Sequence, residues 1–240
     1  MIDNLSLLIA ATPRLEVHKH TIIPLVKKLK SLNIDLSVHL NMDVPSFLSN
    51  SDYQSTYIEI SKIVEKVFYK KNCENPCFSR AFNWLFDSAQ ENSSDFFFWI
   101  EDDWFLNSSS DFLKSLNKAD KYDISTYVNP FASGPPFIFK KDVLNKIYEL
   151  KPSYGNIDPE KIIMKSLYHV PRGQKHDETA EYYESVSDFS HCRFGTREDI
   201  KIFHDESLPV IFTDAGREWM RGNKIRKWPS ASKLTKSSKT

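Results

Sequence analysis

The sequence predicts an α/β protein with a mostly parallel central sheet flanked by helices, and three observations support this prediction. The chain opens with an apolar strand pattern at Leu5–Ala11, a helical pattern at Ile22–Leu32 and a second strand pattern at Leu36–Leu40. A strand–helix–strand unit of this kind places its strands parallel, with a right-handed crossover. The apolar run Phe96–Ile100 is typical of a strand buried on both faces. A chain of 240 residues with 40% hydrophobic content is also long enough to bury a full core.

The remaining elements continue this mixture of helices and strands. Helical spacing predicts helices at Tyr57–Tyr69, Ser79–Ala89, Asp111–Leu116, Asp142–Leu150 and from Asp158 to Leu167. Strand patterns occupy Tyr122–Val128, Phe137–Phe139, Ile200–His204 and Leu208–Asp214. Between them, Val170–Ser190 is polar and is expected to be a long loop, a kind of segment that is usually functional or mobile.

Composition and charge narrow the class of protein. The 32 basic and 32 acidic residues cancel, so no overall positive field indicates a nucleic-acid partner. Three cysteines are too few for a disulfide framework, which favours a cytoplasmic location. No stretch approaches the roughly 18 apolar residues of a membrane span. The segment 229–240 is expected to be a disordered basic tail, with weak contact to an anionic membrane as the alternative.

Common nucleotide and hydrolase motifs are missing from the chain. It contains no Gly-x-x-x-x-Gly-Lys-Ser/Thr loop, no Gly-x-Gly-x-x-Gly turn and no Gly-x-Ser-x-Gly elbow, and it has only 6 glycines. A P-loop site, a dinucleotide site of the usual kind and a nucleophilic serine elbow are therefore not expected.

The segment most indicative of function is the acid triplet that follows the buried strand. Glu101, Asp102 and Asp103 come directly after Ile100, and clustered carboxylates need a cation or basic side chains nearby. Ligands of parallel sheets bind beyond the carboxyl ends of the strands, where the turns at 12–14 and 41–43 are also expected. A divalent cation that prefers oxygen ligands is the predicted occupant, and a solvated acidic turn is the alternative.

Around this triplet, the segment Trp99–Leu106 resembles the DxD motif of GT-A glycosyltransferases, here in a Glu-Asp-Asp form. The segment Ser133–Phe137 resembles the acceptor-side segment that follows the DxD strand, and Asp214–Trp219 resembles a C-terminal segment of small microbial or viral glycosyltransferases. The resemblance implies a Rossmann-like GT-A fold in a single domain, residues 1–228. Its nucleotide-binding half would span 1–106, and its acceptor-binding half would span 107–228.

The same resemblance implies roles for individual residues around a Mn²⁺ or Mg²⁺ ion. Asp103 would ligate the metal, and Asp102 or Glu101 would bind the ribose or a metal-bound water. A late histidine often completes the metal site in this family, and His204 and His191 are the candidates. The remaining roles implied are nucleotide contact by Thr12, Arg14 and Asp43, stabilisation of the departing diphosphate by Arg217, and general base for Asp158 or Glu160.

The function implied is therefore metal-dependent glycosyl transfer. A sugar would move from a nucleotide-diphosphate sugar of UDP or GDP type to a hydroxyl of a carbohydrate or glycan acceptor, with inversion. Two alternatives are a metal-dependent phosphohydrolase or nucleotidyltransferase, and a non-catalytic nucleotide-sugar binding protein. The first alternative lacks the additional Asp/His cluster that a two-metal site needs.

Overall fold

The computed structural model describes residues 2–44, 52–72, 78–127, 136–150, 200–203 and 211–215. A seven-stranded sheet in the order β3-β2-β1-β4-β7-β6-β8 and a two-stranded sheet of β5 and β9 form its framework. The strands are β1 (Asn4–Ala11), β2 (Asp35–Asp43), β3 (Lys66–Asn72), β4 (Phe96–Glu101), β5 (Trp104–Leu106), β6 (Ile124–Thr126), β7 (Phe137–Lys140), β8 (Ile202–Phe203) and β9 (Phe212–Asp214). The helices are α1 (Leu15–His18), α2 (Ile22–Lys30), α3 (Ser55–Ser61), α4 (Phe78–Gln90), α5 (Ser109–Ala119) and α6 (Lys141–Leu150).

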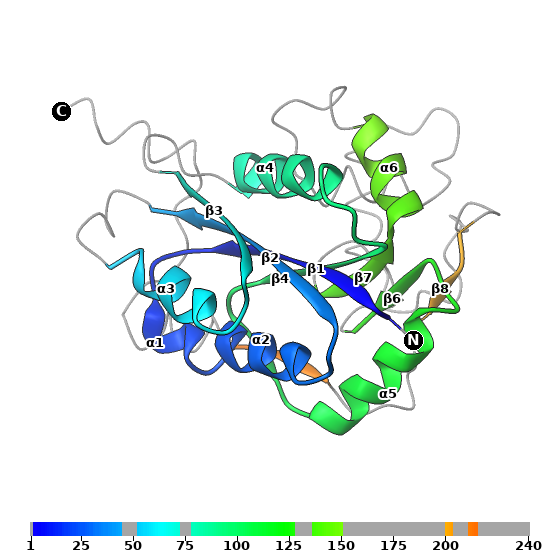
Figure 1. Cartoon of the computed structure of the whole chain (residues 1–240), viewed down its shortest axis with the longest axis horizontal. Helices are drawn as coiled ribbons and strands as arrows, with labels where there is room; N and C mark the ends of the chain where they lie inside the picture. The colour runs from blue at the N-terminus through cyan, green and yellow to red at the C-terminus, as the bar shows by residue number, and fades with distance from the viewer. Residues whose placement is uncertain are drawn as a thin grey trace, which may run out of the picture.

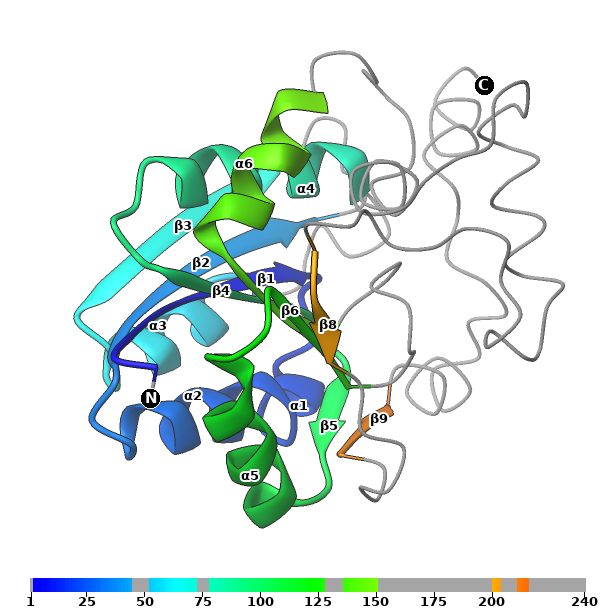
Figure 2. The ribbon, with the colours of Figure 1, turned by 90° about the vertical axis from the view of Figure 1, so that its right-hand side faces the viewer.

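Helices cover both faces of the large sheet (Figure 1). Side chains of α2, α3 and α5 share one apolar cluster with the sheet, and those of α4 and α6 share the other. Strands β1 to β4 run parallel where they pair, whereas β7 runs antiparallel to both β4 and β6. Figure 2 shows the same layers from the side. The prediction of an α/β protein with a mostly parallel central sheet flanked by helices is confirmed.

The two central strands are buried on both faces, as their continuous apolar runs predict. Alternate residues of β1 enter opposite clusters: Leu7 and Ile9 pack toward α2, and Leu8 packs toward α4. Strand β4 does the same with Phe98 on one side and Trp99 on the other, and both are fully buried. This burial fixes the register of both strands, since a slip by one residue would exchange the two faces.

The connection from α2 to β2 shows how the first crossover is made. Apolar residues of α2, including Leu25 and Leu29, recur at helical spacing and are buried. Beyond the helix, Asn33 takes φ 57, a left-handed conformation that asparagine adopts more readily than most residues. The chain then turns into β2, whose eight residues Asp35–Met42 pair in parallel with β1.

One predicted element is wrong. The expected helix Tyr57–Tyr69 is a shorter helix, α3, followed by the edge strand β3. In β3, exposed and half-buried residues alternate along most of the strand, as expected for an edge strand. Phe68 is 43% exposed, yet its ring stacks on His39 of β2 at 4.6 Å between centroids. Tertiary pairing with β2 therefore overrides the helical spacing of the local sequence.

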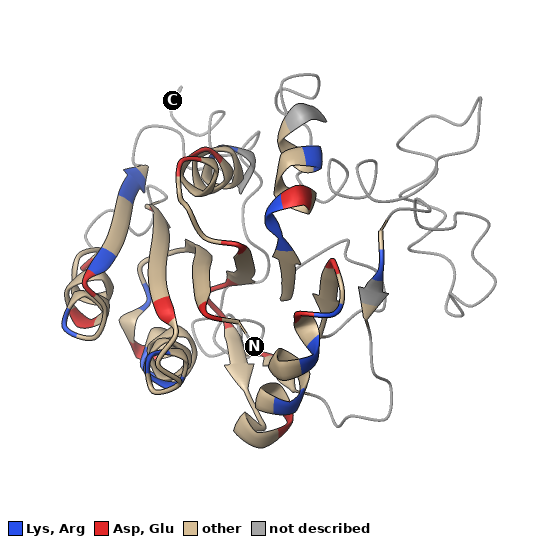
Figure 3. Cartoon of the chain, turned by 45° about the vertical axis from the view of Figure 1, so that its right-hand side comes forward, with Lys and Arg blue, Asp and Glu red and all other residues tan. Residues whose placement is uncertain are grey.

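Charged residues lie mainly on the helices and at the strand ends (Figure 3). Among the described residues, no helix has both the length and the apolar character that a membrane crossing requires.

Candidate functional site

The candidate site lies at the carboxyl ends of three neighbouring strands. Ala10 of β1 lies between Asn41 of β2 and Glu101 of β4 in the sheet register. The turns that follow these strands therefore lie side by side at the carboxyl edge. The expectation that residues 12–14, 41–43 and 101–103 share one edge is confirmed.

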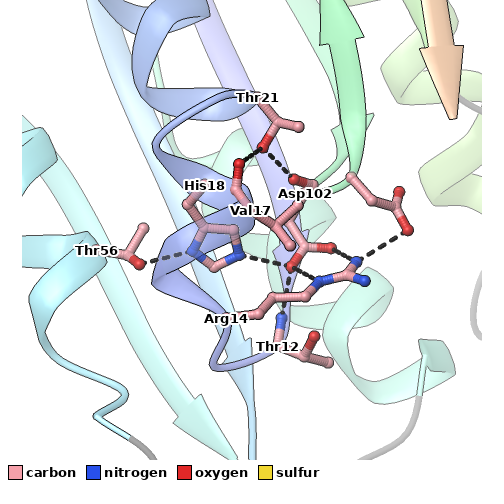
Figure 4. A network of polar contacts seen from close by, with 8 residues as sticks. Thr12, Arg14, Val17, His18, Thr21, Thr56 and Asp102 are labelled. Carbon is pink, nitrogen blue, oxygen red and sulfur yellow. Dashed lines mark hydrogen bonds and ion pairs between the residues drawn. The ribbon is translucent and has the colours of Figure 1, made fainter. Parts of the chain in front are cut away.

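Asp102 lies at the centre of a buried polar network (Figure 4). Its Oδ2 accepts hydrogen bonds from the Thr12 backbone N–H at 2.9 Å, from Arg14 Nε at 2.9 Å and from His18 Nε2 at 2.7 Å. Its Oδ1 accepts from Arg14 Nη2. Although burial disfavours the charged form, Arg14 and His18 hold the pKa of Asp102 well below its usual range. Asp102 is therefore a buried, ionised carboxylate.

Arg14 connects the two aspartates of the triplet. Its Nη2 also donates to Asp103 Oδ2 at 2.9 Å, and only 3% of the Arg14 side chain is exposed. Burial alone would lower the pKa of Arg14, but the charges of Asp102 and Asp103 raise it above its ordinary value. The guanidinium is thus a fixed cation in the site.

The local chain around Arg14 is shaped by the same network. The one-turn helix α1 begins after Arg14, whose carbonyl accepts from the backbone N–H groups of Val17 and His18. The Thr21 hydroxyl lies 2.6 Å from the Asp102 carbonyl and 3.0 Å from the Val17 carbonyl, and its single proton is shared between these two acceptors. These contacts fasten the turn after β1 to the turn after β4.

Asp103 differs from its neighbour in both exposure and charge balance. Its side chain is 15% exposed. Burial and the charge of Asp102 raise the pKa of Asp103 to about 6, although Arg14 opposes the shift, and Asp214 raises it further. Asp214 belongs to β9, which pairs with β5, and the Ala215 N–H donates to the Asp103 carbonyl at 2.7 Å. A cation beside Asp103 would relieve this electrostatic cost.

A second polar group lies at the end of β2 and β3. The Asn72 side-chain amide donates to Asn41 Oδ1 at 2.9 Å and to Asp43 Oδ1 at 2.8 Å. Burial raises the pKa of Asp43 to about 6, while Asn72 and the charge of Arg80 oppose the shift. The charge of Asp102 also raises the pKa of Asp43, so the two polar groups interact electrostatically along the edge of the sheet.

Three buried polar atoms at this edge have no hydrogen-bond partner within the described part of the chain. They are Thr12 Oγ1, Asn41 Nδ2 and Trp104 Nε1. Buried polar groups in proteins nearly always find a partner. Three such atoms in the turns and strand ends around the acid triplet are consistent with a polar ligand at this edge.

Several predicted site residues lie outside the described residues. These are Asp158, Glu160, His191, His204 and Arg217. Of the predicted site residues that are described, the structure brings Thr12, Arg14, Asp102 and Asp103 into direct contact, with Glu101 adjacent in the chain and Asp43 on the neighbouring strand. Within the described ranges, no group of three or more His, Cys, Asp and Glu side chains has a geometry suited to a metal ion.

The sequence did not point to His18, Thr21 or Thr56 as members of the site. His18 is fully buried, and its Nδ1 lies 2.6 Å from the Thr56 hydroxyl of α3. The one available signal was a histidine four residues after Arg14, which has no specificity by itself.

No protein-family model matches the chain, and no curated protein matches it. Among solved structures, S. aureus TarS 1–349 is 10% identical with a TM-score of 0.49, and the match covers 68% of this chain and 55% of that one. The mannosyltransferase PcManGT from Pyrobaculum calidifontis, in complex with GDP-Man and Mn²⁺, is 9% identical with a TM-score of 0.48, covering 69% and 52%. A putative nucleotide-diphospho-sugar transferase from Desulfovibrio desulfuricans G20 is 14% identical with a TM-score of 0.41, covering 69% and 75%. The matches to TarS 1–349 and PcManGT thus span about half of those chains, and likeness at this level says nothing about the chemistry of this one.

Proposed function

We propose that the chain is a metal-dependent glycosyltransferase of the GT-A type that uses a nucleotide-diphosphate sugar. The observation that carries the proposal is the position of Asp103. It lies beside an Asp102–Arg14 ion pair at the carboxyl edge of a parallel sheet, with its pKa raised to about 6. Ligands of open α/β sheets bind at this edge.

The charge balance of the site favours a bound cation. Arg14 neutralises Asp102, so its second contact leaves Asp103 only partly compensated, and Asp214 adds a further negative charge nearby. Carboxylate oxygens are the ligands that Mg²⁺ and Mn²⁺ prefer. Asp103 would hold the ion, with Asp214 as an additional ligand, and His204 stays a predicted one. The bound ion would supply positive charge to the departing diphosphate.

The nucleotide is assigned to the edge between β1, β2 and β4. Asp43 and Asn41 there offer an acceptor and a buried donor, and the Thr12 hydroxyl offers another polar contact. Glu101 is partly exposed, whereas Asp102 is 3% exposed, so Glu101 is the better placed of the two to reach the ribose. Residues 1–106 would thus form the nucleotide-binding half, and 107–228 would bind the acceptor.

In the transfer step, the bond between the sugar C1 and the diphosphate breaks as the acceptor oxygen bonds to C1. Asp158 or Glu160 is proposed to take the proton from the acceptor hydroxyl. Arg217 is proposed to bind the diphosphate as its charge develops. Inversion at C1 follows from direct displacement by the acceptor oxygen.

Calorimetry with UDP and GDP, each with and without Mn²⁺, tests the proposal. We expect binding of one nucleoside diphosphate that strengthens with Mn²⁺ in the wild-type chain. Asp103→Ala should remove the Mn²⁺-dependent part, whereas Glu59→Gln, an exposed change on α3, should leave it unchanged. A wild-type chain that binds neither diphosphate in the presence of Mn²⁺ would contradict the proposal.

Sugar transfer separates the proposal from its alternatives. A phosphohydrolase would release phosphate from the nucleotide without an acceptor. A nucleotidyltransferase would join a nucleotide to a phosphorylated sugar. A non-catalytic binder would hold the nucleotide-sugar without turnover.

A further inference from the structure

We propose that His18 is a positioning residue of the candidate active site. It acts through Asp102: the two side chains hold Arg14 in place and keep Asp102 itself out of ligand contact, so that Asp103 is the aspartate left for the cation. This inference rests on the proposed function and assigns a role to a buried residue that reaches the site only through Asp102.

The His18 ring is engaged at both nitrogens. Nε2 lies 2.7 Å from Asp102 Oδ2 and must donate, because an ionised carboxylate only accepts. Nδ1 lies 2.6 Å from the hydroxyl of Thr56, which is also buried. The ring of His18, a residue of α1, therefore connects α3 to the turn after β4. The hydrogen bonds at its two nitrogens fix the orientation of the ring.

Protein donors and burial leave Asp102 poorly accessible to a ligand, since the residue is 3% exposed. Oδ2 accepts three protein hydrogen bonds, which is more than its two lone pairs take singly, and Oδ1 accepts one from Arg14. A ribose hydroxyl or a metal ion that bound Oδ2 would have to displace one of these donors. Each belongs to a buried residue or to the backbone, so displacement would leave a buried polar group without its partner.

His18 also restricts how Asp102 presents its second oxygen. Three donors hold Oδ2, and Oδ1 then faces Arg14 Nη2, the same nitrogen that donates to Asp103. Loss of the His18 contact removes one of the three constraints on this carboxylate. Rotation of the carboxylate would move Arg14 and change the charge that Asp103 experiences.

A second buried histidine provides a matched control. His39 is fully buried on β2, and its Nδ1 lies 2.7 Å from the Ser88 hydroxyl of α4. Its polar neighbours are Ser88 and Asn92, and within the described residues it makes no hydrogen bond to the acid triplet or to Arg14. If His18 is only a core residue, His18→Leu and His39→Leu should have the same effects.

The experiment compares Mn²⁺-dependent binding of UDP and GDP by the full chain and four variants, with thermal unfolding measured on each. We expect His18→Leu to weaken this binding about tenfold or more, while His39→Leu lowers stability and keeps the affinity. His18→Gln should recover most of the affinity, since its amide donates to Asp102. Thr56→Val, which frees the other end of the ring, should weaken binding less than His18→Leu does.

Two results would overturn the inference. One is a folded His18→Leu that binds as tightly as the wild type. The other is an affinity loss in His18→Gln as large as that in His18→Leu. If His18→Leu does not fold, Thr56→Val decides the matter, because a folded Thr56→Val that binds as tightly as the wild type also overturns the inference.

Failure of the proposed function would look different, because the wild-type chain would then bind neither diphosphate. In that case, NMR of the histidine ring nitrogens tests the hydrogen bond from His18 to Asp102 directly. A proton on Nε2 of His18 whose signal shifts in Asp102→Asn supports this hydrogen bond, and a ring protonated at Nδ1 alone overturns it.

Discussion

Arg14 and Asp102 form a two-pronged ion pair in which Nε donates to Oδ2 at 2.9 Å and Nη2 donates to Oδ1. Only 3% of the Arg14 side chain and 4% of the Asp102 side chain are exposed. The pair is 88 residues apart in sequence and joins the turn after β1 to the turn after β4. The stability of the sheet edge and the charge balance of the candidate site therefore depend on the same contact.

Breaking this pair from one side is expected to destabilise the fold strongly. Arg14→Ala leaves Asp102 buried without its main counter-ion, which costs about 3–5 kcal/mol. The double variant Arg14→Ala/Asp102→Asn should lose less than the sum of the two single changes, because it removes both charges. Urea unfolding of the four proteins measures this coupling, and strictly additive losses would contradict it.

The two adjacent aspartates are expected to respond in opposite directions to removal of charge. Asp102→Asn should destabilise, since the network favours ionised Asp102. Asp103→Asn should be neutral or stabilising by up to about 2 kcal/mol near pH 7.5, because the raised pKa means that folding disfavours the ionised form of Asp103. Chemical unfolding without metal tests this, and a large loss of stability in Asp103→Asn would show that the sign is wrong.

The proposed general base makes a kinetic prediction. Asp158→Asn and Glu160→Gln should each leave nucleotide binding intact, and one of them should lower the transfer rate by about 10²–10⁴-fold. Glycosyl transfer at saturating donor, with diphosphate affinity measured in parallel, distinguishes the two. If neither variant slows transfer, the base lies elsewhere, and Val170–Ser190 is the next segment to search.

His39 gives a prediction about pH. Burial lowers the pKa of His39 to about 4, below its ordinary value of 6.5. Between these values the unfolded chain binds a proton that the folded chain does not, so this histidine reduces stability as pH falls from 6.5 toward 4. The contribution is on the order of 3 kcal/mol when complete. His39→Gln should therefore flatten the pH dependence of unfolding in this window, and an unchanged slope would exclude the effect.

The first half of the sheet was predictable because its elements carry strong local patterns. The strands β1 and β4 are continuous apolar runs, and α2 has a regular apolar stripe. Edge strand β3 was mistaken for part of a helix because a half-exposed strand has a weaker pattern, and its pairing with β2 is set by tertiary contacts.

The candidate site was predictable only where it is continuous with a strand. Glu101, Asp102 and Asp103 follow β4 directly, so their place at the edge follows from the fold. The contact between His18 and Asp102 spans 84 residues and depends on how α1 packs, which no local spacing encodes. For the same reason, the opposite charge environments of Asp102 and Asp103 emerged only from the structure.

The pairing of β5 with β9 has a consequence for biosynthesis. Residues 104–106 acquire their strand partner, and the Asp103 carbonyl its donor, only from residues 212–215. A nascent chain that has emerged only as far as α6 contains the acid triplet but lacks the strand pairing with β9 and the hydrogen bond from Ala215. The candidate site is therefore expected to mature late in translation, after most of the parallel sheet has been synthesised.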